Sequence, residues 1–394
     1  MAWDGAADRI GPAQAEHESG IQGAALTRSA IAIAHDYLTQ RGGAERVVLT
    51  MRKAFPDVPI HTTLYDPEGT YPEFRNAEII ASGLNQVSLF RQDHRLALPF
   101  LAAASNRVRI EADLTIVSSS GWAHGFPTDG HKVVYCHNPA RWLYQTDEYL
   151  GGPAWRHHLG APMLAMRPAL RRWDRRAAES VDVFLANSGV VQRRIQDTYG
   201  RDAEILHPPH SMDPTAPQEP IDELGDFDPG FALVVSRLLP YKNVDAAIEA
   251  VRRTGRPLVV IGHGPEAARL RESAQAHVRI LSGLTDAQLR WVYARAGVLV
   301  TPSHEDFGLT PLEAAAFGVP TVALGSGGFL ETVVEGRTGL FFDHPTPKEI
   351  ERALHEADSH TWDRTAIRAR AEEFSEGHFI QRLTEISKEV LDLV

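Results

Sequence analysis

Cysteine and long apolar runs are the two features this sequence has least of. Its 394 residues include one cysteine, Cys136, so an intramolecular disulfide and a cysteine-rich metal site are both excluded. No apolar run approaches the roughly 18 residues that a membrane helix needs. The first thirty residues are polar and acidic and lack the apolar segment of a secretory signal. We therefore expect a soluble protein of a reducing cytoplasm.

Positive charge is also in short supply. The sequence has 40 Lys and Arg against 51 Asp and Glu, a formal net charge of −11. A nucleic-acid partner needs a basic face, and because no long basic run is present we expect no such partner. The most basic stretch is RPALRRWDRR, residues 167–176. We favour an arginine-bearing helix surface there. The alternative is peripheral contact with an anionic membrane, at its inner face, through Arg171 and Arg172.

Short apolar runs recur along the chain, and helical patterns lie between several of them. Each run ends in small, polar or proline residues, as in AIAIAHDYL, LTIVSSS, KVVYCHN and VDVFLANS. This alternation predicts β-α-β units with a parallel sheet covered on both faces. After a stretch with six prolines, residues 207–230, the alternation restarts with FALVVSRL, PLVVIGHG, VRILSGL, GVLVTPS, PTVAL and GLFF. We predict an α/β protein with two doubly wound, Rossmann-like domains facing across a cleft.

The domain limits follow from the same patterns. The expected parts are a mobile tail at 1–28, a first domain at 29–212, a linker at 213–230, a second domain at 231–375 and a terminal helix at 376–394. In the last part Phe379, Leu383, Ile386 and Val390 have the spacing of an amphipathic helix. Ligands of doubly wound sheets bind at the carboxyl ends of the strands. Candidate functional residues are therefore sought at those strand ends.

The stretch SHEDFGLTPLEAAAFGVP, residues 303–320, carries two glutamates on either side of a helix start. Thr310 as N-cap, Pro311 next and Glu313 three residues later form the pattern of a capping box, which alone could explain Glu313. Glu305 instead lies in the loop that leaves a strand. The N–H groups of a helix start suit a phosphate. A carboxylate beside such an anion site indicates hydroxyl groups of a sugar or ribose.

Two cations follow the first strand of the second domain, in VSRLLPYKN. Arg237 and Lys242 straddle a turn and could clamp a diphosphate. Two solvated surface charges are the alternative. Because both cations are expected at the same sheet edge as Glu305, we favour the functional interpretation.

Other motifs are weaker. Gly262-x-Gly264 in VVIGHGPEA resembles the start of a dinucleotide-binding fingerprint, but the next strand ends in Ser282-Gly283 without the acid that the fingerprint requires. We interpret it as a tight turn, and an NAD-dependent oxidoreductase is kept as an alternative. The Asp-x-Asp at 226–228 lies in the linker, and the histidines lack the spacing of a zinc site. We expect no metal.

Taken together, these motifs resemble family 4 glycosyltransferases of the two-domain GT-B fold, over about residues 30–390. EDFGLTPLEAAAFGVPTVA matches the family's Glu-x7-Glu motif, and VSRLLPYKN matches its Arg/Lys phosphate motif. GSGGFLETV matches its Gly-Gly-x-x-Glu loop, and ANSGVVQRRI is also similar. The resemblance implies that the terminal helix crosses back onto the first domain. It also implies retention of anomeric configuration without a metal cofactor.

The resemblance further implies roles for single residues. The implied catalytic set is His137, Glu305, Arg237 and Lys242, in which the two cations bind the donor diphosphate and Glu305 faces the donor sugar. The implied donor contacts also include Gly42, Gly43, Gly283, Leu284, Phe307, Gly308, Leu309, Thr310 and Glu313. Among these, Glu313 would accept hydrogen bonds from the ribose. His124 and Arg141 are the acceptor-side candidates.

The donor and acceptor are less well specified. VVYCHNPARWLYQTDEY and ILHPPHSMD resemble polysaccharide and O-antigen mannosyltransferases. That resemblance favours transfer of a hexose, mannose, from GDP-mannose over a UDP-sugar. A glycan, a lipid-linked sugar and a small molecule all stay open as acceptors. A catalytically inactive sugar-binding protein on the same fold is the remaining alternative.

Overall fold

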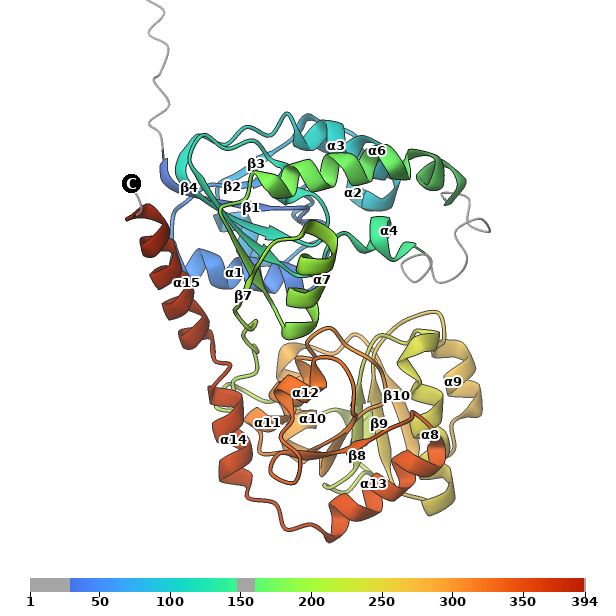
Figure 1. The fold of residues 1–394 in the computed structure, drawn as a ribbon. Helices are drawn as coiled ribbons and strands as arrows, with labels where there is room; N and C mark the ends of the chain where they lie inside the picture. Colours follow the sequence, from blue (N-terminus) through green and yellow to red (C-terminus); the bar gives the residue numbers. More distant parts are fainter. Residues whose placement is uncertain (1–28, 147–159, 393–394) are drawn as a thin grey trace, which may run out of the picture.

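The computed structural model describes residues 29–146 and 160–392. The expected tail at 1–28 and the last two residues of the expected terminal helix lie outside this part. Two α/β domains follow one another along the chain, and Figure 1 shows them stacked with the first domain above the second.

The first domain is built on a seven-stranded parallel sheet with the order β3-β2-β1-β4-β5-β6-β7. Its strands are β1 (Ser29–His35), β2 (Ile60–Thr62), β3 (Ile79–Ala81), β4 (Ala112–Ser119), β5 (His131–Cys136), β6 (Val183–Ala186) and β7 (Glu204–Ile205). Its helices are α1 (Gly43–Ala54), α2 (Ser88–Gln92), α3 (Leu98–Ser105), α4 (Arg141–Tyr144), α6 (Gly160–Glu179) and α7 (Gly189–Tyr199). The central strands β4 and β5 are buried almost throughout, as expected of a sheet covered on both faces.

The second domain has a six-stranded parallel sheet with the order β10-β9-β8-β11-β12-β13. Its strands are β8 (Ala232–Val235), β9 (Leu258–Ile261), β10 (Val278–Leu281), β11 (Val298–Thr301), β12 (Thr321–Leu324) and β13 (Gly339–Phe342). Its helices are α8 (Val244–Thr254), α9 (Ala267–Ser273), α10 (Asp286–Arg295), α11 (Thr310–Ala316), α12 (Phe329–Thr332), α13 (Pro347–Ser359) and α14 (Arg364–Glu372). Short 3-10 turns, such as Pro240–Lys242, complete both domains. In each sheet the strand order reverses beside the first strand, which is where doubly wound folds bind ligands.

The terminal helix α15 (Glu376–Leu391) packs on the first domain, beside α1 (Figure 1). Phe379, Leu383, Ile386 and Val390 share one apolar cluster with residues of α1, β1, β4 and β5. At the start of α15 the Glu376 carboxylate accepts hydrogen bonds from Lys53 Nζ at 2.7 Å and Thr50 Oγ1 at 3.0 Å. The chain therefore crosses between the domains twice, once near residue 210 and once near residue 375.

The stretch expected to be a linker is in part core of the second domain. Ile221, Leu224 and Phe227 are buried in the same cluster as Phe231. The prolines and acidic residues around these three positions make the stretch resemble a linker in the sequence. The second domain therefore begins before residue 231.

The capping box expected at Thr310 is wrong. Leu309 is the N-cap of α11 and itself has helical backbone angles, φ −73° and ψ −31°, and no side chain caps the helix start. Because Thr310 already lies inside the helix, its hydroxyl comes one position too late to act as the cap. The structure does form a capping box at α10, where Thr285 and Gln288 bond each other's backbone N–H groups.

Candidate active site

The Glu305 loop follows β11 and lies at the carboxyl end of the second sheet. Glu305 Oε1 accepts hydrogen bonds from Ser303 Oγ at 3.0 Å and from the Lys242 ammonium. The loop's backbone is fixed by the glycine pair before α12, since Gly328 N–H donates to Glu305 C=O at 2.9 Å. A Cβ at Gly327 would lie 2.3 Å from that same carbonyl oxygen, so only glycine permits this close approach. The Glu305 loop and the glycine pair before α12 are therefore packed directly against each other.

The two expected phosphate-binding cations take different positions. Lys242 ends the 3-10 turn after β8, and only 4% of its surface is exposed. Its ammonium lies 4.9 Å from the centre of the Tyr241 ring while it is paired with Glu305. Arg237 is exposed, and its guanidinium donates to Tyr241 Oη at 3.2 Å. Both cations thus lie around Tyr241, and Lys242 is the one held against Glu305.

Glu313 is held by a residue that the sequence analysis missed. Tyr293 Oη, on α10, donates to Glu313 Oε2 at 2.7 Å. Burial raises the pKa of Glu313, and the Tyr293 hydrogen bond and the charge of Arg46 act in the opposite direction. No local pattern links Tyr293 to Glu313, because they lie on different helices.

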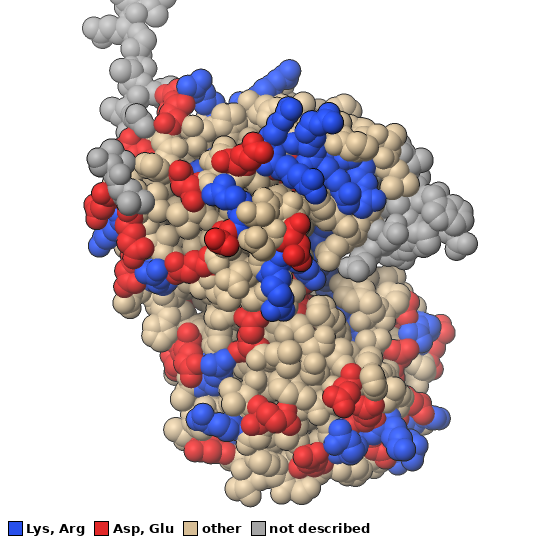
Figure 2. Space-filling view, viewed as in Figure 1, with Lys and Arg blue, Asp and Glu red and all other residues tan. Residues whose placement is uncertain are grey.

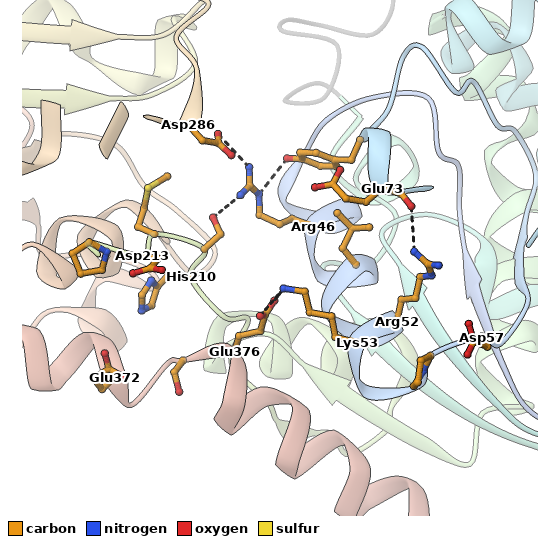
Figure 3. Close-up of a pocket in the computed structure, with 17 residues that line it drawn as sticks. Arg46, Arg52, Lys53, Asp57, Glu73, His210, Asp213, Asp286, Glu372 and Glu376 are labelled. Carbon is orange, nitrogen blue, oxygen red and sulfur yellow. Dashed lines mark hydrogen bonds and ion pairs between the residues drawn. The ribbon is translucent and has the colours of Figure 1, made fainter. Parts of the chain in front are cut away.

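Arg46 reaches from the first domain toward the second. It lies in the first turn of α1, just after the Gly42-Gly43 pair, and it donates to Ser211 Oγ at 2.7 Å and to Tyr71 Oη at 3.3 Å. Figure 3 shows its guanidinium facing Asp286, whose carboxylate is 3.9 Å away. A cavity of about 780 Å³ lies beside Arg46. It is lined in part by the two segments in which the chain crosses between the domains. Arg46 is a second functional candidate that the sequence analysis missed.

A buried polar chain leads from the glycine pair to His137. A Cβ at Gly42 would lie 2.6 Å from Glu45 Oε2, and Glu45 Oε1 is 3.8 Å from His35 Nε2. His35 Nδ1 contacts Ser118 Oγ at 3.0 Å, and the same hydroxyl contacts His137 Nε2 at 2.8 Å. Burial alone would lower the pKa of His35, but the facing carboxylate of Glu45 raises it above the ordinary value.

His137 itself is a neutral imidazole. Burial, together with the nearby His35, lowers the pKa of His137 to about 3. A neutral ring can exchange hydrogen bonds with a sugar hydroxyl but brings no positive charge. Its backbone is fixed on both sides, because its N–H donates to Ser119 C=O at 2.8 Å and its C=O accepts from Asn187 Nδ2 at 3.0 Å.

The two acceptor-side candidates lie in different surroundings. His124 is 3% exposed and lies between Ser119 Oγ, at 3.2 Å, and the buried Asp174, at 3.1 Å. It belongs to the core under α6 and is not available to an acceptor. Arg141 is exposed at the start of α4, but its guanidinium pairs with Asp306 of the second domain. It is therefore engaged in a contact between the domains.

The remaining expected donor contacts divide into backbone and side-chain positions. The Phe307 ring is 4% exposed and stacks on His207 with ring centres 5.1 Å apart, so only its backbone can face a donor. Gly308 has φ +85°, and a Cβ there would lie 2.5 Å from the Phe329 ring. Gly283 has φ +73°, and no other atom lies within 4 Å of the position that an added Cβ would take. Leu284, which follows it, is partly buried. Leu309, Thr310 and Gly43 are partly or fully exposed.

The Gly262-x-Gly264 turn is filled by the chain itself. A Cβ at Gly262 would lie 1.8 Å from Ser236 C=O, and one at Gly264 would lie 2.3 Å from Leu238 C=O. Leu238 C=O also accepts the N–H of Glu266, just before α9, at 3.1 Å. A pyrophosphate would need that N–H and that space. The glycines therefore serve close packing of two backbone segments.

The described residues contain neither a metal-ligand cluster nor a membrane-crossing helix. Among residues 29–146 and 160–392, no group of three or more His, Cys, Asp or Glu side chains could hold a metal ion. Asp226, from the Asp-x-Asp stretch, pairs with Arg279 at 2.9 Å. In the same part of the chain, no helix is both long and apolar enough to cross a membrane.

Comparison with known proteins gives one family match for each domain. The model described as Glycosyltransferase Family 4 matches residues 41–212, and the model described as Glycosyl transferases group 1 matches residues 220–374. A GDP-mannose-dependent alpha-(1-6)-phosphatidylinositol monomannoside mannosyltransferase of Mycolicibacterium smegmatis is 31% identical over 223 residues. That match covers 50% of this chain and 58% of the relative. The glycogen synthase of Pseudomonas aeruginosa is 35% identical over 151 residues, which are 35% of this chain and 29% of that enzyme.

Solved structures agree on the fold. Anabaena HepE in complex with UDP superposes with a TM-score of 0.66 and 16% identity, covering 91% of this chain and 100% of that one. Sucrose-phosphate synthase from Thermosynechococcus elongatus gives a TM-score of 0.64 at 16% identity, covering 93% and 100%. At this identity the likeness concerns the fold alone. With its Glu-x7-Glu loop at the second sheet and a family match on each domain, the chain belongs to glycosyltransferase family 4 and has the GT-B fold.

Proposed function

We propose that this protein is a retaining glycosyltransferase that moves a hexose from a nucleoside-diphosphate sugar to an acceptor hydroxyl. The observation that carries the proposal is the meeting of two loops. Asp306, next to Glu305, accepts a hydrogen bond at 2.7 Å from Asn138, next to His137. The Glu305 loop of the second domain thus meets the His137 loop of the first, as a reaction between a donor and an acceptor requires.

Each group has a role in the proposed reaction. When the bond from the sugar to the diphosphate breaks, negative charge grows on the leaving oxygens, and Lys242 and Arg237 stabilise it. Glu305 accepts hydrogen bonds from sugar hydroxyls. Glu313 accepts from the ribose, with Tyr293 holding its other oxygen. The acceptor hydroxyl attacks on the face from which the diphosphate leaves, and no metal is needed in this scheme.

We infer GDP-mannose as the donor in preference to a UDP-sugar. The M. smegmatis relative is named as GDP-mannose-dependent, which supports this donor. HepE, a solved structure of the same fold, was in complex with UDP, which is the competing donor class. The relatives give no support to an NAD-dependent oxidoreductase.

Calorimetric binding of GDP, UDP, dTDP, ADP and NAD, with and without EDTA, tests the donor. Binding of GDP that is unchanged by EDTA supports the inference. Binding of UDP alone overturns the mannose donor, and binding of NAD alone overturns the transferase. Turnover of the matching nucleotide-sugar then separates an enzyme from an inactive sugar-binding protein.

We further propose a lipid-linked acceptor, reached by peripheral membrane contact through the first domain. Figure 2 shows Lys and Arg gathered over α6, where Arg172, Arg175 and Arg176 are exposed. Phe100 of the adjoining α3 and Leu164 of α6 are also exposed. Arginines beside exposed apolar groups suit an anionic membrane surface.

Liposome sedimentation tests the membrane contact. Reversing the charge at the exposed Arg172 and Arg176 to Glu should abolish binding to anionic vesicles. The matched control reverses Arg252 and Arg253, at the end of α8 in the second domain. Equal binding of the two double variants would contradict the proposal.

A further inference from the structure

The Asp306 side chain joins the two domains. It follows Glu305 in the second domain, and three donors of the first domain converge on it. Asn138 Nδ2 donates to Oδ2 at 2.7 Å, Arg194 Nη1 donates to Oδ1 at 2.6 Å, and the Arg141 guanidinium also donates to Oδ2. Both carboxylate oxygens are therefore satisfied by the opposite domain.

The charged groups at this contact stabilise one another only while the two domains touch. The Asp306 side chain is 11% exposed and Asn138 is buried. Burial alone would raise the pKa of Asp306, but Arg141 and Arg194 lower it below its ordinary value. A desolvated carboxylate is stable only with such partners. Separation of the domains would have to return three charged groups to water.

This contact lies at the end of the site where the donor sugar is proposed to bind. Asp306 is covalently next to Glu305, and Asn138 is next to His137. The Asn138 contact therefore fixes the distance between the Glu305 and His137 loops. Arg46 lies at the other end, where its charge acts on Glu313 and its guanidinium faces Asp286.

A second carboxylate supports the same arrangement. Glu331 of α12 accepts the N–H of Gly189, the first residue of α7, at 3.0 and 3.1 Å. Glu331 belongs to the segment whose Gly328 N–H donates to Glu305 C=O. Arg194 lies farther along the same α7. The two loops that hold Glu305 are thus both tied to the first domain, at α7.

We propose that Asp306 is a positioning residue, which holds the Glu305 loop against the His137 loop and so sets the donor sugar in place for attack. Asn138, Arg141 and Arg194 are its receiving groups in the first domain. This inference rests on the proposed transferase activity. Asp306 does not touch the reacting atoms in this role, so its loss should affect turnover and the closure of the domains while leaving diphosphate binding intact.

Asp306→Asn tests the proposal, because it keeps the shape of the side chain and removes its charge. We expect kcat to fall at least about tenfold, since small misplacement of reacting groups is costly. The calorimetric Kd of the nucleoside diphosphate should stay within about threefold, because Lys242 and Glu313 are untouched. Asp358→Asn is the matched control, since Asp358 pairs with Arg256 inside the second domain. A wild-type kcat in Asp306→Asn would overturn the proposal.

A distance measurement tests the contact without any activity. Spin labels on Glu111→Cys and Lys348→Cys, both exposed and in different domains, report the separation of the domains, and the native Cys136 is buried. Asp306→Asn should broaden or lengthen the distance distribution, and Asp358→Asn should not. An unchanged distribution would overturn the proposal. If no nucleotide-sugar is turned over, the proposed function fails, and this measurement still decides the role of Asp306.

Arg194→Gln approaches the contact from the first domain and guards against a local folding defect of the Asp306 variant. It should give the same change in distance and the same pattern of lowered kcat with retained Kd. The double variant should lose little more than either single variant, because both remove one interaction. Strictly additive losses would show two independent effects and would contradict the proposal.

Discussion

Lys242 and Glu305 form an ion pair at the carboxyl end of the second sheet, although 63 positions separate them in the sequence. The lysine is buried while the glutamate is one-third exposed, so the carboxylate is the side of the pair that a ligand reaches first. A diphosphate at this site would compete with Glu305 for the ammonium. Glu305 would then be free to accept from sugar hydroxyls. The pair would therefore link recognition of the sugar to recognition of the phosphates.

Lys242→Ala should lower kcat by roughly a hundred- to a thousandfold, the usual effect of removing one group that stabilises developing charge. Steady-state kinetics with the donor identified by calorimetry measures this. Lys348→Ala, at the exposed start of α13, is the control and should behave as wild type. Turnover near the wild-type rate in Lys242→Ala would exclude this role for the lysine.

Tyr293→Phe should make donor binding more sensitive to acid. The Tyr293 hydrogen bond lowers the pKa of Glu313, which burial raises, so its removal raises that pKa further. Ionised Glu313 is only an acceptor, as the ribose hydroxyls require, whereas the protonated acid carries a donor of its own. Affinity therefore falls as pH falls through the pKa of Glu313, and the midpoint should lie at higher pH in the variant. Calorimetric Kd values measured from about pH 5 to pH 8 test this, and identical midpoints would contradict it.

Periodicity predicted the sheets well because it is a local property. The apolar runs FALVVSRL and GVLVTPS contain β8 and β11, and both strands are buried over nearly all their length. The amphipathic spacing after residue 376 likewise predicted α15. In each case, burial on a helix or sheet face requires a pattern that repeats within a few residues.

The errors and omissions at the candidate site depend on groups far apart in the chain. His124 follows a strand as a site residue would, but the buried Asp174 of α6 holds it in the core. Arg141 is an exposed cation near a strand end, and the sequence does not indicate that its partner is Asp306. Tyr293 was missed for the same reason. Such roles depend on tertiary contacts, which no local pattern in a single sequence indicates.

Gly262→Ala should destabilise the protein without a specific effect on donor binding. Its Cβ would lie 1.8 Å from the Ser236 carbonyl oxygen, which is backbone and has no room to move. Overpacking of this kind costs typically about 1–3 kcal/mol in the free energy of unfolding. Gly83→Ala is the control, because no atom lies within 4 Å of the added Cβ. Urea unfolding distinguishes the two, and equal stability would show that the turn is not filled by the chain.

His137 should make the stability of the fold depend on pH in mildly acidic solution. Burial lowers its pKa from 6.5 to about 3, so between these values the unfolded chain binds a proton that the native protein does not. This contribution to the free energy of unfolding is fully present above the unfolded-state pKa of 6.5. It decreases as pH falls below that value, by up to about 1.4 kcal/mol per pH unit. His61, whose pKa burial lowers to about 4, adds a similar slope.

His137→Asn should remove one of these two contributions and leave the other. Urea unfolding between about pH 7 and pH 4.5 should then show a shallower loss of stability in the variant, by close to one proton per molecule. His344→Asn, at an exposed position of the second domain, is the control and should keep the wild-type slope. A variant with the same slope as wild type would mean that native His137 takes up a proton as readily as the unfolded chain does. In that case it could bring a positive charge to the leaving diphosphate, and its role would be electrostatic instead of hydrogen bonding to the sugar.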